Sequence, residues 1–153
     1  MSLDSTLLEG VSPAIASLRQ SLLYSPRYLT SQTPWHGLIP FAYWLCQTVR
    51  PSRIVELGVY RGDSFFCLHD ACRFDQLESI TAVDNWVGDQ HTGDYGEGPL
   101  EQFEKEVARR ADGRIQAIRK NFSDAVDQFS DGSIDLLHID GAHSYEDIKS
   151  DYD

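Results

Sequence analysis

The fold is decided by residues 54–64, which read IVELGVYRGDS. The run opens with β-branched and apolar residues and is broken at Gly58, with a second glycine at Gly62. A short β-branched run that ends at a glycine is typical of a strand. The stretch therefore predicts a strand over residues 54–59, a tight turn, and a helix over residues 64–74.

The same strand and helix patterns alternate along the rest of the chain. Further strands are expected over residues 80–84, 115–119 and 134–139. The helices between them are expected around Leu100 to Arg110, over residues 123–129, and after Ser144, which caps the last helix with Asp147. Strands that alternate with helices form a parallel sheet with right-handed crossovers. We therefore expect an α/β, doubly wound, mostly parallel Rossmann-like sheet with strand order 3-2-1-4.

Residues 1–50 read as a helical lead-in to a core over residues 51–153, within one domain. A first helix is expected over residues 13–24, with Ser12 as its N-cap and Pro13 at its first position. A second helix, residues 39–49, is apolar nearly all round and is expected to be buried. In the later helix, the pairs Glu101/Lys105 and Glu106/Arg110 are expected opposite the apolar face.

The composition excludes several classes of function. The 153 residues carry a formal charge of −11, which repels nucleic acid and anionic membranes. No apolar run reaches the roughly 20 residues of a membrane-spanning helix, and no secretory signal is visible, so we expect a cytoplasmic protein. The three cysteines have no metal-site spacing and are expected to be reduced and mostly buried.

The glycine turn argues against a dinucleotide. Its spacing is G-x-x-x-G, and Tyr60 stands where the dinucleotide fingerprint needs a glycine for close approach of a pyrophosphate. Tyr145 and Lys149 have the spacing of an oxidoreductase pair, but they follow the fourth strand directly. An NAD-dependent oxidoreductase is therefore kept only as the alternative enzyme.

Ligands of open α/β sheets bind beyond the carboxyl ends of the strands. After the second strand, Asp84 can accept ribose hydroxyl hydrogens or serve as a turn residue, and Trp86 can stack on adenine or pack in the core. After the third strand, Asn121 and Phe122 can border an adenine, while Ser123 is expected to cap the next helix.

The fourth strand ends in a group of polar residues that packing does not explain. Asp140 can bind a divalent metal or a ligand's ammonium group, and His143 is a candidate general base. If Asp140 holds Mg²⁺, further ligands have to come from elsewhere, such as the acidic loop with Asp89 and Asp94. His138 lies in an apolar run and is interpreted as a core histidine.

Three motifs together resemble one family. They are VELGxxxG from Val55, AVDxWxGD from Ala82, and IDLLHIDGxHxYE from Ile134. They are similar to class I S-adenosylmethionine-dependent methyltransferases, in particular to the bacterial subgroup often associated with glycosyltransferases. The segment WHxxIPFA from Trp35 resembles the lead-in helix of that subgroup.

The resemblance implies a role for each matching residue. Glu56, Gly58 and Gly62 would surround the methionine part of S-adenosylmethionine, Asp84 would hold the ribose, and Asp140 with His143 would face methyl transfer. The predicted cofactor-binding residues are Glu56, Gly58, Tyr60, Gly62, Ser64, Asp84, Asn85, Trp86, Asn121, Phe122 and Asp140. The predicted catalytic residues are His143 and Asp140, with Asp140 also the candidate ligand of Mg²⁺.

The resemblance implies O-methylation of a sugar or small metabolite. Members of this family continue into a fifth strand and beyond, so we expect a domain truncated after its fourth strand. A truncated domain that binds a cofactor or partner without turnover is the non-enzymatic alternative. A homo-oligomer or a neighbouring glycosyltransferase are the expected protein partners.

Overall fold

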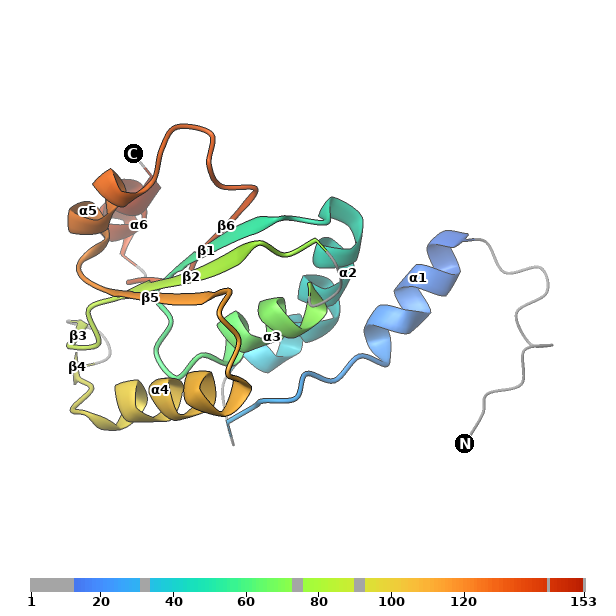
Figure 1. Ribbon diagram of the computed structural model, residues 1–153, viewed down its shortest axis with the longest axis horizontal. Coiled ribbons are helices and arrows are strands. Elements are labelled where there is room, and N and C mark those ends of the chain that lie inside the picture. Colours follow the sequence, from blue (N-terminus) through green and yellow to red (C-terminus); the bar gives the residue numbers. More distant parts are fainter. Residues whose placement is uncertain (1–12, 31–33, 73–75, 90–92, 143, 153) are drawn as a thin grey trace.

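A four-stranded parallel sheet forms the centre of the computed structural model, which describes residues 13–30, 34–72, 76–89, 93–142 and 144–152. Its strands are β1 (Arg53–Leu57), β2 (Ser79–Asp84), β5 (Ile115–Arg119) and β6 (Leu136–Ile139). They lie in the order β5-β2-β1-β6 (Figure 1). Counted along the chain this is 3-2-1-4, so the predicted fold class and strand order are confirmed.

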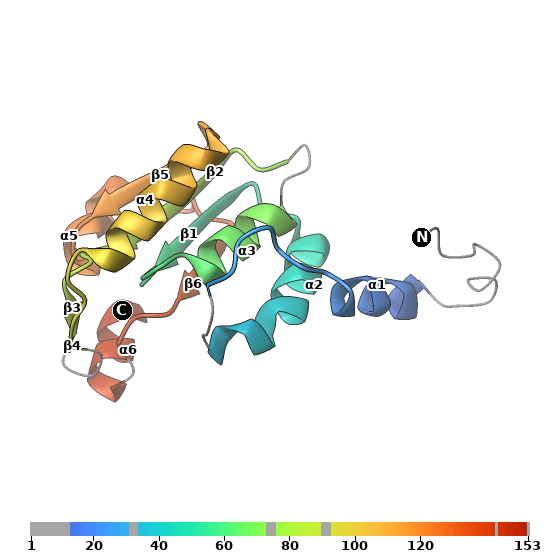
Figure 2. The ribbon, with the colours of Figure 1, turned by 90° about the horizontal axis from the view of Figure 1, so that it is seen from below.

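Helices cover both faces of the sheet, as the two views show (Figures 1 and 2). On one face lie α2, α3 and α4, and on the other lie α5 and α6. The helical elements are α1 (Pro13–Leu22), the 3₁₀ turn η2 (Pro34–Leu38), α2 (Ile39–Val49), α3 (Asp63–Ala71), α4 (Gly98–Arg110), α5 (Phe122–Ala125), the 3₁₀ turn η3 (Val126–Gln128) and α6 (Tyr145–Tyr152).

The alternation of side chains along the strands builds a core on each face. Ile54 and Ile80 point to the face of α3 and α4, where Phe65, Phe66 and Phe103 are fully buried. Val55 and Val83 point to the other face and pack against Ala125 of α5. In β1, Glu56 is two residues after Ile54 and points to the same face, so its carboxyl group enters the larger core.

The second helix of the lead-in is less buried than the sequence predicts. In α2 only Ile39, Ala42 and Cys46 are buried, while Phe41 is 55% and Trp44 39% exposed. The apolar face of α1 is also exposed, and its predicted cap Ser12 lies outside the described residues. The prediction of a buried second helix was wrong, because an apolar surface all round a helix does not say how much of it the fold covers.

The predicted caps have two different outcomes. Ser144 and Asp147 do form the reciprocal cap of α6, with the Asp147 amide donating to Ser144 Oγ at 3.1 Å. The cap predicted at Ser123 was wrong, because α5 begins one residue earlier at Phe122 and Asn121 is its N-cap residue.

The Glu106/Arg110 pair lies in the interior and not on the exposed face of α4. The Arg110 side chain is 2% exposed and binds both Glu106 and Asp70 of α3. Arg27 in the segment before η2 binds the same Asp70 carboxylate. Four charged residues therefore tie α3, α4 and the lead-in together, because a carboxylate on α3 meets the charged face of α4.

The long loop after β2 contains a small antiparallel ribbon, in which Gly88 pairs with Asp94. Its strands are β3 (Gly88–Asp89) and β4 (Gly93–Asp94).

As predicted, Cys46, Cys67 and Cys72 are free and buried. In the described part of the chain, every helix is too short or too polar to cross a membrane.

Candidate functional site

The turn from β1 into α3 is held in an unusual backbone conformation. Gly58, Tyr60 and Gly62 all have positive φ, at +82°, +51° and +89°. A side chain at Gly58 would meet the chain after β6, because a Cβ built there lies 2.2 Å from the carbonyl oxygen of Asp140. The Asp140 amide also donates to the carbonyl of Leu57 at 2.8 Å. The glycine turn and the end of β6 therefore lie backbone against backbone at the carboxyl edge of the sheet.

Asp84, at the end of β2, closes this turn. One carboxylate oxygen accepts the backbone N–H groups of Val59 and Tyr60 at 2.8 and 2.9 Å, and the other accepts that of Trp86 at 2.7 Å. A carboxylate offers about four acceptor positions, so about one remains. The carboxylate can thus receive at most one ribose hydroxyl. The turn role was one of the two interpretations open from the sequence, and it is the one that the contacts show.

Trp86 packs in the core. It is 2% exposed, its ring lies 5.2 Å from that of Phe103, and its indole N–H donates to the carbonyl of Tyr60 at 2.8 Å. Stacking on adenine and packing in the core were the two interpretations open from the sequence, and these contacts show packing in the core.

Glu56 and His138 face one another on neighbouring strands. They are register partners, and Nδ1 of His138 lies 3.4 Å from the Glu56 carboxylate, which also accepts the hydroxyl of Ser64. Burial raises the pKa of Glu56, against the opposing effects of His138 and Ser64. Burial would lower the pKa of His138, but the Glu56 carboxylate raises it. The pair therefore retains a proton more readily than either group would in water, and the interpretation of His138 as an ordinary core histidine missed this pairing.

Asn121 and Phe122, the residues predicted to border an adenine, lie against residues at the ends of β2 and β6. Asn85 donates from its side chain to Asn121 at 2.9 Å. The ring of Phe122 lies so close to Gly141 that a Cβ there would be 2.7 Å from it. The structure thus brings the three strand ends into contact. Tyr60, the remaining predicted contact, is 40% exposed and its ring lies 4.7 Å from that of Tyr95.

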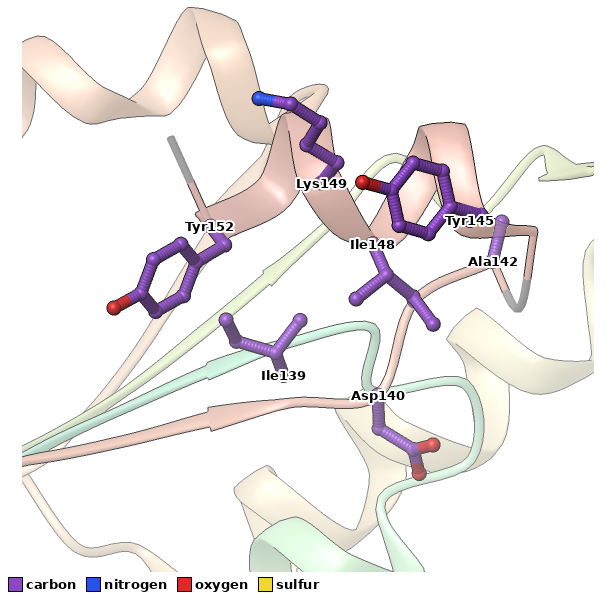
Figure 3. A pocket seen from close by; sticks show the side chains of 8 residues that line it. Ile139, Asp140, Ala142, Tyr145, Ile148, Lys149 and Tyr152 are labelled. Atoms are coloured by element: carbon purple, nitrogen blue, oxygen red, sulfur yellow. The ribbon is translucent and has the colours of Figure 1, made fainter.

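Asp140 lies beside a cavity of about 420 Å³ between β6 and α6. Ile139, Ile148 and Tyr152 line this cavity, whereas the Asp140 carboxylate points away from α6 (Figure 3). His143, the predicted base, lies outside the described residues. Across the described ranges, no three His, Cys, Asp or Glu side chains are grouped so that they could hold a metal ion.

A histidine of the lead-in also reaches this edge. Nε2 of His36, in η2, lies 2.8 Å from Asp63, the first residue of α3. The ring of Trp35 lies 6.1 Å from the ring of His138. In the sequence, Trp35 and His36 stand out only as part of a resemblance, because 27 positions separate His36 from Asp63.

Residues 55–153 match the family described as "Methyltransferase domain". The chain belongs to this family. An uncharacterised protein of Sinorhizobium fredii, y4gI, is 40% identical to the methyltransferase chain over 136 residues. The match covers 86% of the chain and 14% of that protein, so the chain spans only a small part of this relative.

Solved methyltransferase structures share the fold. A methyltransferase of Podospora anserina with bound S-adenosylhomocysteine has a TM-score of 0.54 and 14% identity, over 92% of the chain and 60% of that protein. An O-methyltransferase of Bacillus cereus, also with S-adenosylhomocysteine, has a TM-score of 0.52 and 16% identity, over 90% of the chain and 60% of that protein. The resemblance to class I methyltransferases seen in the sequence is confirmed at the level of family and fold.

Proposed function

We propose that this methyltransferase domain binds S-adenosylmethionine and transfers its methyl group to an oxygen of a small molecule. The observation that carries the proposal is the contact between the Gly58 turn and Asp140, which joins the two methyltransferase motifs of β1 and β6 at the carboxyl edge of the sheet. Ligands of open α/β sheets bind at this edge. The S-adenosylhomocysteine bound in the Podospora anserina and Bacillus cereus proteins of the same fold supports the choice of cofactor.

The chemistry of the edge fits this cofactor. S-Adenosylmethionine carries a sulfonium and an ammonium group and no phosphate. The acidic side chains of Asp84 and Asp140 lie at the turn, and Glu56 is buried next to them. A pyrophosphate would meet the Asp140 carboxylate and the side chain of Tyr60. We therefore propose Gly58, Gly62 and Ser64 beside the methionine part and Asn85, Asn121 and Phe122 beside the adenine. Asp84 mainly holds the turn and offers one position to the ribose.

When bound, S-adenosylmethionine supplies an electrophilic methyl group. The chain has to position the acceptor oxygen in line with it and remove the hydroxyl proton. We propose His143, three residues after Asp140, as the general base, and Asp140 as a group that orients the cofactor. The described residues do not fit a metal site, so no step is assigned to Mg²⁺.

The finer identity of the acceptor follows from the sequence resemblance. We propose that the acceptor is a sugar or another small hydroxylated metabolite. We also propose that a neighbouring glycosyltransferase in the same assembly supplies this acceptor. The 14% coverage of the S. fredii relative supports a domain that acts within a longer polypeptide. A cytoplasmic location and a homo-oligomeric state stay predictions from the sequence.

Transfer of a radiolabelled methyl group from S-adenosylmethionine tests the proposal. The acceptors to supply are methyl glycosides and catechol, a sugar and a phenol of simple structure. We expect label in a methyl ether with the wild-type chain, and turnover lower by about 10²–10⁴-fold in His143→Ala with unchanged S-adenosylhomocysteine affinity. Normal turnover of the His143→Ala chain would show that His143 is not the general base.

A further inference from the structure

We propose that His36 is a further residue of the acceptor site, where Nδ1 of its ring accepts a hydrogen bond from a second hydroxyl of the acceptor, next to the one that is methylated. The inference rests on the proposed function and deepens it. The reacting hydroxyl keeps its single proton for the proposed base His143, and the contact with His36 holds the acceptor in place beside the methyl group.

Asp63 sets the tautomer of the ring. Its carboxylate accepts the backbone N–H of Thr30 at 2.7 Å and the Thr30 hydroxyl at 2.7 Å, in addition to its contact with His36. An ionised carboxylate only accepts hydrogen bonds, so Nε2 of His36 has to be the donor. In the neutral ring the proton then resides on Nε2, and Nδ1 keeps its lone pair.

The N-terminus of α3 supports this assignment. Asp63 is the first residue of that helix, and a carboxylate is stabilised there by the unpaired backbone N–H groups and the helix dipole. The Asp63 side chain is 9% exposed and is held from two elements of the lead-in. A buried carboxylate that orients an imidazole is the arrangement by which enzymes fix which ring nitrogen can act on a substrate.

His36 lies between the two motifs that build the site. Asp63 follows directly on Gly62, the end of the glycine turn. Trp35, the neighbour of His36, contacts the ring of His138 two residues before Asp140. His36 is therefore bonded to the residue after the glycine turn, and its neighbour Trp35 contacts β6. This places His36 near the carboxyl edge of β1 and β6, where the cofactor is proposed to present its methyl group.

The ring also retains access to solvent. The His36 side chain is 28% exposed although Nε2 is engaged, and within the described ranges Asp63 is its hydrogen-bonding partner. By contrast, His69 bridges Asp112 and Arg110 and is 1% exposed. His69 has its carboxylate partner too, but both of its nitrogens are occupied, so it serves as the structural comparison.

The first experiment needs no acceptor. Nitrogen-15 spectra of the histidine rings at pH 8, in the wild-type chain and in Asp63→Ala, report the tautomer. We expect the Nε2–H form for His36 in the wild-type chain and a mixture of the two tautomers in Asp63→Ala, which has no acceptor for the Nε2 proton. Diethyl pyrocarbonate followed by peptide mass spectrometry should modify His36 and leave His69 unmodified. An Nδ1–H tautomer, or a His36 that is as unreactive as His69, would overturn the proposal.

The second experiment distinguishes a contact with the substrate from a purely structural contact with Asp63. In His36→Gln the side-chain amide can still donate to Asp63, but it has no ring nitrogen at the position of Nδ1. We expect melting temperature and S-adenosylhomocysteine affinity to match wild type, while kcat/KM for the methylated acceptor falls roughly tenfold or more, as expected for one lost hydrogen bond to the acceptor. A normal kcat/KM in His36→Gln would show that His36 only links the lead-in to α3, and it would overturn the proposal. If the wild-type chain does not bind S-adenosylhomocysteine, the proposed function is overturned instead.

Discussion

Gly58 and Asp140 touch backbone to backbone, so that the space for a Cβ at Gly58 is filled by the Asp140 carbonyl oxygen at 2.2 Å. The positive φ of Gly58 adds to this constraint. We expect Gly58→Ala to lower the free energy of unfolding by roughly 3 kcal/mol or more, since the left-handed conformation alone costs about 1–2 kcal/mol. Urea denaturation measures this loss. Gly98→Ala is the matched control, because a Cβ at Gly98 meets nothing within 4 Å, and equal losses in the two variants would contradict the close contact.

Asp84 is predicted to act on stability as well as on affinity. Asp84→Ala leaves three backbone N–H groups of the turn without their acceptor, and each buried unsatisfied donor costs about 1–3 kcal/mol. We expect a drop of roughly 3 kcal/mol or more in the free energy of unfolding, together with weaker S-adenosylhomocysteine binding. Asp127→Ala, at an exposed position, should change neither. If Asp84→Ala has wild-type stability and only weaker S-adenosylhomocysteine binding, Asp84 binds the ribose and does not stabilise the turn.

The buried ion cluster makes a prediction about pH. Burial would raise the pKa of Asp70, but the nearby ring of His69 and the hydrogen bonds from Arg110 and Arg27 together hold it below its usual range. The pKa of Glu106 is lowered too, because Arg109 and Arg110 outweigh its burial. A lowered folded-state pKa stabilises the fold above the unfolded values of about 3.9 and 4.3, and the effect is lost as pH falls.

Asp70→Asn removes the charge and leaves the buried Arg110 with Glu106 as its remaining carboxylate partner. We expect a loss of roughly 3–5 kcal/mol at pH 7, measured by urea denaturation, as for other broken buried pairs. Because the wild-type chain alone loses the contribution of Asp70 in acid, its stability should fall more steeply than that of Asp70→Asn below about pH 4. Parallel curves for the two proteins would contradict the role of Asp70.

The sheet could be predicted from the sequence, but the contacts of the site only in part. The parallel sheet follows from the alternation of strands and helices and from the handedness of crossovers, and the order 3-2-1-4 is the one expected of a Rossmann-like sheet. The position of Asp84 at a strand end was also predictable. Its three backbone partners were not, because they depend on the conformation of Tyr60 and Trp86, two residues with positive φ that sequence patterns do not reveal.

Charge pairs were predicted less well than apolar ones. The spacing of Glu106 and Arg110 gave the pair but not its burial, which is caused by Asp70 on another helix. The link between His36 and Asp63 is likewise a long-range contact between the lead-in and α3. Such contacts have no local pattern, so only the folded chain brings them together.

The most direct test of the central claim is calorimetric titration of the wild-type chain with S-adenosylhomocysteine and, separately, with NAD. The account predicts that S-adenosylhomocysteine binds at one site and that NAD releases no heat of binding, since Tyr60 and the surrounding carboxylates oppose a pyrophosphate. Asp127→Ala should bind S-adenosylhomocysteine like wild type. Binding of NAD without binding of S-adenosylhomocysteine would contradict the account.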